Sequence, residues 1–157
     1  MPDLEHYRYR GARASILIHE RELRHFVETW KRADTARLAL PVTDDPCYES
    51  LAHLLQHNLR AARGYMVWIC EKLELPDPQI EPTPEPDKIV ARADEYLEHV
   101  LARWRLPLAD VDEERMSRPS YVSRWGMDYS IDSMLEHAVC HPIRHTFQLE
   151  ELMAAKF

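Results

Sequence analysis

Two of the nine histidines in this sequence, His141 and His145, lie four positions apart in a segment with apolar residues at helical spacing. On an α-helix, residues i and i+4 project from the same face. An imidazole without a partner is costly to bury among apolar side chains, whereas two imidazoles on one helical face can bind a metal ion together. We therefore predict that this segment forms a helix and that the helix carries a metal site.

A second pair at the same spacing, His53 and His57, lies in an apolar segment earlier in the chain. His57 shares a helical strip with Gly64, which leaves room beside the imidazole and costs about 1 kcal/mol relative to alanine in a helix interior. With His141 and His145, His57 completes the three-histidine set of catalytic zinc sites, in which one coordination position stays open. His53 remains an alternative to His57 as the ligand from this segment.

Further polar residues flank the proposed ligands, and each is a candidate for orienting a ligand or contacting a substrate: His53, His137, Arg144 and Gln148. The sequence identifies no general base more directly than these. Pro142 lies between His141 and His145, where it removes one helical hydrogen bond. It predicts either a kink or a new helical segment that begins at His141.

Other interpretations of the histidines remain open. A di-iron carboxylate site needs Glu-x-x-His on two helices, and only Glu22 and His25 show that spacing clearly. An iron site with two histidines and one carboxylate requires Glu20 or a neighbouring carboxylate to point inward. A third alternative is that the histidines are core residues that bind backbone groups or water and hold no metal, although an i, i+4 pair on an apolar face favours the metal site.

Composition limits the class of protein. The chain has 20 Lys and Arg against 27 Asp and Glu, and this net charge of -7 argues against a nucleic-acid partner. Its three cysteines show no CxxC spacing, which is typical of a reducing compartment rather than of a disulfide framework. No apolar run is long enough to span a membrane. We therefore predict a cytoplasmic protein of one domain, residues 1–157, without a membrane partner.

Apolar periodicity predicts four helices, over residues 12–33, 46–73, 87–105 and 131–154. Asp45 and Ser130 are the predicted N-caps of the second and fourth helices. Five prolines in residues 75–86 predict an extended crossover between the second and third helices. Aromatic and β-branched residues around Gly126 predict a short hairpin or structured loop. The fold class is all-α, a four-helix bundle with long crossover connections.

These motifs resemble the DinB-like superfamily of metal-binding four-helix bundles. The resemblance rests on Leu54-Leu-Gln-His57 with Tyr65 and Trp68, and on the spacing of His137, His141, His145 and Gln148 near the end of the sequence. It covers nearly the whole chain and implies that His57, His141 and His145 are the metal ligands. It also implies a divalent ion, zinc or nickel, and a homodimer.

Characterised members of this superfamily include thiol-dependent transferases and isomerases that use bacillithiol or mycothiol. The resemblance thus implies a metal-dependent S-transferase or a related detoxifying enzyme. Its partners would be a small-molecule substrate and a low-molecular-weight thiol. The alternatives are a non-catalytic metal-binding or stress-response bundle that acts through dimerisation, and a metal-dependent hydrolase. The residues alone would permit hydrolysis as well as thiol transfer.

Overall fold

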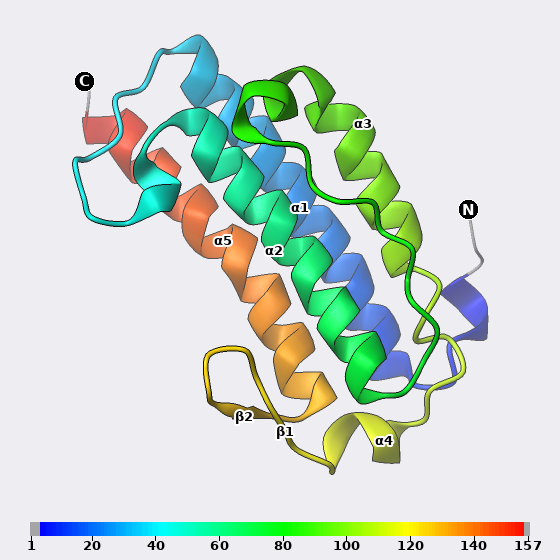
Figure 1. Cartoon of the computed structure of the whole chain (residues 1–157). Helices are drawn as coiled ribbons and strands as arrows, with labels where there is room; N and C mark the ends of the chain where they lie inside the picture. Colours follow the sequence, from blue (N-terminus) through cyan, green and yellow to red (C-terminus); the bar gives the residue numbers. More distant parts are fainter. Residues whose placement is uncertain (1–3, 156–157) are drawn as a thin grey trace.

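The computed structural model describes residues 4–155, which form five α-helices and one two-stranded antiparallel sheet. Four of the helices are long and lie side by side, with α2 between α3 and α5 and with α1 behind them (Figure 1). The prediction of a helical protein is confirmed. The bounds of the long helices are α1 Arg10–Thr35, α2 Leu51–Lys72, α3 Pro86–Trp104 and α5 Ile131–Ala155.

The core lies where the long helices face one another. In α1, the residues at helical spacing that predicted the first helix are buried, among them Ile16, Leu23 and Phe26. Each large apolar side chain buried in this way contributes about 1.5–3 kcal/mol to the free energy of unfolding. Among the described residues, no helix has both the length and the apolar character that a membrane span requires.

The second helix begins later than predicted. The carboxylate of Asp45 accepts a hydrogen bond from the backbone N–H of Cys47 at 3.0 Å and caps only a short 3-10 helix, Pro46–Tyr48. Helix α2 starts at Leu51, where Ser50 is extended and its hydroxyl accepts from the backbone N–H of His53. The predicted helix is therefore divided in two. Asp45 and Ser50 each accept a hydrogen bond from a backbone N–H group that is otherwise unsatisfied at the start of its own helix.

The proline-rich connection between α2 and α3 is extended, as predicted. Side chains of both helices hold its backbone carbonyls: Arg63 donates to Ile80 at 3.0 Å, and Arg103 donates to Pro78 at 2.8 Å. These contacts satisfy carbonyl groups that a segment without regular structure leaves unpaired. The connection therefore forms a fixed strap along α2 and α3 and does not contribute to the histidine site.

Between α3 and α5 the chain forms one further helix and a hairpin. Helix α4, Glu113–Ser117, was not predicted; it is capped by Asp112. Strand β1, Tyr121–Val122, pairs with β2, Asp128–Tyr129, which confirms the predicted hairpin. Gly126 in its turn has a φ of +86°, a conformation that side chains with a Cβ rarely adopt.

Helix α5 is one element from Ile131 to Ala155 and continues through Pro142. No second segment begins at His141, so the predicted interruption is wrong in that form. Proline removes a single N–H donor. Helix α5 packs against its neighbours, most extensively against α1, and this packing stabilises it on both sides of Pro142. Thr146 donates its hydroxyl to the carbonyl of Pro142 at 2.8 Å. The i, i+4 relation of His141 and His145 is thereby preserved.

Candidate metal centre

The structure brings His57 of α2 together with His141 and His145 of α5. One ring nitrogen from each residue lies within 4.8 Å of the others. The Nε2 atoms of His57 and His141 are 3.0 Å apart. The His145 ring centroid lies 5.2 Å from that of His57 and 4.9 Å from that of His141. This three-histidine cluster joins two helices whose histidines are more than 80 positions apart in sequence.

Burial keeps the three imidazoles neutral at physiological pH. It lowers the pKa of His145 to about 4 and, with help from the neighbouring rings, the pKa of His141 to about 2. Burial also lowers the pKa of His57, although the negative charge of Asp45 opposes that shift. Desolvation disfavours the charged form of an imidazole. Each ring therefore offers a nitrogen lone pair, which is the form that binds metal.

The cluster fits a divalent metal ion. Two neutral imidazoles that face each other can share at most one N–H, so the contact between His57 and His141 does not satisfy the lone pairs of the cluster. The Nδ1 atom of His145 is buried and has no hydrogen-bond partner among the described residues. Three imidazole nitrogens without a carboxylate are the donor set of catalytic zinc sites, and imidazole also suits nickel and copper.

The other histidine of α2, His53, does not belong to the cluster. Its Nδ1 lies 2.8 Å from the hydroxyl of Ser50, and its Nε2 lies 3.4 Å from a carboxylate oxygen of Glu49. His53 is thus part of the N-terminal turn of α2. Of the two predicted candidates from this helix, the structure places only His57 beside the α5 histidines.

His137 also lies apart from the cluster and contacts aromatic residues. Its ring is stacked on Trp125 of the hairpin, with centroids 5.0 Å apart and an interplanar angle of 28°. Tyr65 and Tyr129 contact it edge-on. These contacts identify His137 as a packing residue that fixes the hairpin against α5. It does not replace a ligand.

Arg144 and Gln148 are exposed on α5 close to the cluster. The positive charge of Arg144 contributes to the lowered pKa values of His141 and His145, after burial and the neighbouring histidines. Gln148 accepts a hydrogen bond from the hydroxyl of Tyr48. That bond ties the 3-10 helix before α2 to the helix that holds two of the histidines.

Sequence patterns did not identify Asp45 and Tyr48 as neighbours of the cluster. The ring of Tyr48 lies 6.3 Å from that of His145. Asp45 is close enough for its charge to raise the pKa values of His57 and His145 against the larger effect of burial. Both residues lie in a segment that was predicted to begin a helix. They lie beside the cluster because this segment packs against α5 near His145 and Gln148.

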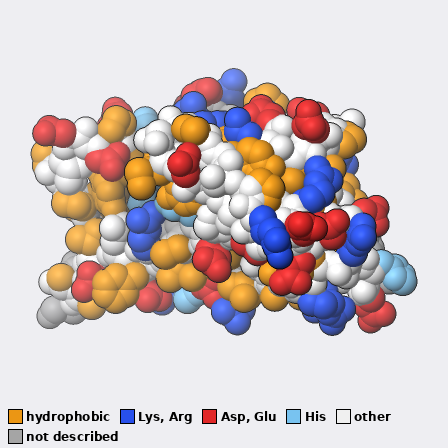
Figure 2. All heavy atoms as spheres, turned by 90° about the horizontal axis from the view of Figure 1, so that it is seen from below, with side chains coloured by type: hydrophobic (Ala, Val, Ile, Leu, Met, Phe, Trp, Pro, Cys, Tyr) orange, Lys and Arg blue, Asp and Glu red, His pale blue; other side chains and the backbone are white. Residues whose placement is uncertain are grey.

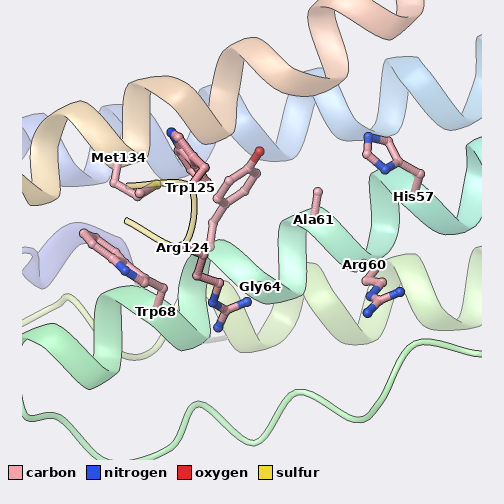
Figure 3. Close-up of a pocket in the computed structure, with 9 residues that line it drawn as sticks. His57, Arg60, Ala61, Gly64, Trp68, Arg124, Trp125 and Met134 are labelled. Carbon is pink, nitrogen blue, oxygen red and sulfur yellow. The ribbon is translucent and has the colours of Figure 1, made fainter. Parts of the chain in front are cut away.

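A pocket of about 300 Å³ adjoins the cluster and shares His57 with it. Figure 3 shows His57 at one end of the pocket and Trp68 with Met134 at the other. The floor is formed by α2, including the predicted small residues Ala61 and Gly64, and the hairpin contributes Arg124 and Trp125. On the face drawn in Figure 2, basic and acidic side chains are interspersed, with hydrophobic groups between them.

The carboxylate alternatives find no support in the described residues. Glu20 binds Arg105 through two hydrogen bonds of 2.9 Å, so its carboxylate is engaged between α1 and α3. Glu22 binds Arg21, and His25 lies 3.8 Å from Glu150. The three-histidine cluster contains no carboxylate among the residues that the structure describes.

Comparisons with known proteins give no match: no family model, no curated protein and no solved structure is similar to this chain. The DinB-like resemblance therefore stays a prediction, which rests on the histidine spacing and on the helix order.

Proposed function

We propose that this chain is a DinB-like four-helix bundle in which His57, His141 and His145 hold a divalent metal ion, and that it is a metal-dependent enzyme. One observation carries the proposal: three neutral imidazoles converge next to a pocket that shares His57 with them. Structural zinc sites use four protein ligands, whereas catalytic sites use three and keep a position open. No fourth histidine, cysteine or carboxylate joins the cluster in residues 4–155.

We infer that the activity is thiol-dependent S-transfer, the chemistry that the DinB-like resemblance implies. A divalent ion lowers the pKa of a coordinated thiol or water and so makes it nucleophilic at neutral pH. His57, His141 and His145 would hold that ion, and Trp125 and Tyr65 line the pocket that shares His57 with them. Hydrolysis uses the same ion and ligands, and it differs in the nucleophile.

A second candidate is a non-catalytic metal-binding bundle that acts through dimerisation. One observation favours it: Ile143 and Phe147 lie one turn apart on α5 and are 40% and 59% exposed. Large apolar side chains that are neighbours on a helix face are typical of an interface. The two candidates share the metal site and differ in whether a substrate reaches it.

Conjugation of a thiol to an electrophilic arene tests the enzyme hypothesis. Zinc- or nickel-loaded protein is mixed with 1-chloro-2,4-dinitrobenzene and, in turn, with glutathione, bacillithiol and mycothiol. In the reaction the thiol sulfur bonds to the ring carbon, chloride leaves and the thiol proton passes to solvent. We expect a rate above background with at least one thiol. His145→Ala should abolish it, and the matched variant His53→Ala should retain it.

Two results contradict the enzyme hypothesis. Metal-loaded protein that accelerates neither thiol conjugation nor ester hydrolysis would favour the non-catalytic candidate. A rate that His145→Ala leaves unchanged would separate the activity from the three-histidine cluster.

Sedimentation of the wild type and of Phe147→Asp tests the dimer, which we expect in the wild type alone.

A further inference from the structure

The pocket beside the cluster has walls suited to a flat apolar molecule. Trp68 is buried and Trp125 on the hairpin is 47% exposed, and both indole rings line the pocket. Tyr65 and Met134 complete the apolar lining. Aromatic rings stack on planar groups with a gain beyond simple burial. The size of the pocket, about 300 Å³, is at the lower limit for small-molecule sites.

The charged residues of the pocket are two arginines. Arg60 lines the pocket together with His57, and it lies on α2 between His57 and Gly64. Arg124 reaches back from the hairpin, and its guanidinium would lie 3.2 Å from a Cβ at position 64. None of the described residues that line the pocket is an Asp or a Glu. The pocket is therefore electropositive in a chain whose net charge is -7.

These arginines have no partners in the described part of the chain. Neither Arg60 nor Arg124 makes an ion pair or hydrogen bond there, and the same is true of Arg144, whose charge acts on Tyr65. Other arginines are paired: Arg24 binds Glu98 and Arg105 binds Glu20. Guanidinium groups bind carboxylates and phosphates through paired hydrogen bonds. The unpaired arginines thus leave such donors available around the pocket.

Tyr65 adds a neutral donor. Its hydroxyl makes no hydrogen bond to any residue that the structure describes. A protonated hydroxyl can donate to an anionic or carbonyl oxygen.

We propose that this pocket binds an organic anion with a flat, apolar body. The body lies against Trp68 and Trp125, Arg124 beside Gly64 binds the anionic group, and Arg60 adds positive charge at the end of the pocket that holds His57. The inference rests on the proposed function in one respect only, that the His57 end is the reacting end. It names the substrate class of the site: a planar carboxylate or a similar anion.

Calorimetric titration with 2-naphthoate tests the proposal, with 2-naphthamide as the neutral ligand of the same shape. The zinc-loaded wild type should bind the anion about tenfold more tightly than the amide, because a charged hydrogen bond is lost with the amide. Fluorescence of Trp68 and Trp125 should change on binding. Equal affinity for the two ligands, or no binding of either, would overturn the proposal.

Three variants locate the binding. Arg60→Gln with Arg124→Gln should reduce naphthoate affinity about tenfold and leave naphthamide affinity unchanged. Arg37→Gln is the matched control, because Arg37 is exposed and unpaired in the described residues and lies outside the pocket. Gly64→Leu should block both ligands, since a Cβ there meets only Arg124 and a longer side chain extends into the pocket. Circular dichroism checks that each variant is folded.

The metal requirement separates this inference from the proposed function. Naphthoate binding that survives in His145→Ala, together with loss of metal, would support the pocket independently of the ion. A wild type that binds no metal but prefers naphthoate would refute the proposed function and retain the pocket. A wild type that binds metal without preferring the anion would refute the pocket alone.

Discussion

Buried histidines occur in two regions of this molecule, and their surroundings differ. His19 of α1 is stacked on Trp104 of α3, with ring centroids 3.7 Å apart and an interplanar angle of 8°. The cluster between α2 and α5 instead brings three imidazoles together. Burial lowers the pKa of His19 to about 3, much as it lowers the values in the cluster. A lowered pKa therefore reports burial in both regions and does not by itself identify a site.

Convergence is what distinguishes the two regions. Neither ring nitrogen of His19 has a hydrogen-bond partner among the described residues, and its ring is stacked on an indole. Each histidine of the cluster has a nitrogen near two others. An isolated neutral imidazole stabilises the fold through packing alone, whereas converging lone pairs form a cation site. Substitutions in the two regions should consequently affect different properties.

Stabilisation by metal is the largest expected effect. Free zinc at a thousandfold excess over its Kd adds about 4 kcal/mol to the free energy of unfolding, which raises the Tm by roughly 10 °C. Thermal unfolding with zinc and with a chelator measures the difference. The difference should vanish in His141→Ala and persist in His19→Leu. An undiminished shift in His141→Ala would contradict the cluster as the binding site.

Removal of the His19 ring should come next in size. His19→Ala leaves a cavity beside Trp104 and should cost about 3 kcal/mol in urea unfolding, with the zinc-induced shift retained. His19→Leu fills most of that volume and removes two unpaired polar atoms, so it should cost much less. If the leucine variant were as unstable as the alanine variant, the imidazole would stabilise the protein through a polar contact in addition to its packing on Trp104.

The pH dependence of stability gives a second test of His19. Its pKa is about 3 when folded and near 6.5 when unfolded, so the unfolded state binds an extra proton between these values. As the pH falls from about 6.5 to about 3, His19 therefore lowers the free energy of unfolding by about 1.4 kcal/mol for each pH unit. Urea unfolding in chelator should show a slope smaller by that amount in His19→Leu. Identical slopes would show that His19 is protonated in the folded protein.

The smallest effect is expected at His53. Its ring is partly exposed and contacts the capping residue Ser50, so His53→Ala should cost less than about 1 kcal/mol. Metal stoichiometry should equal that of the wild type. A loss of metal in this variant would reverse the choice between His53 and His57.

Local patterns were sufficient to predict the helices and the paired ligands of α5. Apolar periodicity identified all four long helices, because each buries one continuous face. The i, i+4 rule identified His141 and His145, since it depends only on helix geometry. Of the two outcomes predicted at Pro142, the new segment at His141 is wrong, because α5 is continuous from Ile131 to Ala155. The predicted start of α2 was wrong for another reason. Asp45 and Ser50 are both good N-caps, and the sequence does not show which of them precedes the long helix.

Contacts between distant segments could not be predicted in the same way. The choice of His57 over His53 depends on how α2 is rotated against α5. The position of Asp45 beside the cluster depends on the connection between α1 and α2. Arg124 and Trp125 enter the pocket because the hairpin folds back over α2. None of these contacts has a sequence spacing that reveals it.

Metal content measured on a matched set of histidine variants tests whether His57, His141 and His145 bind the ion. Untagged protein is reconstituted with zinc, passed through gel filtration and submitted to elemental analysis. We expect one zinc per chain in the wild type and in the variants His19→Leu, His53→Ala and His137→Ala. The variants His57→Ala, His141→Ala and His145→Ala should retain little or none. Stoichiometric zinc in any of these last three folded variants, or no zinc in the wild type, would contradict the three-histidine metal site.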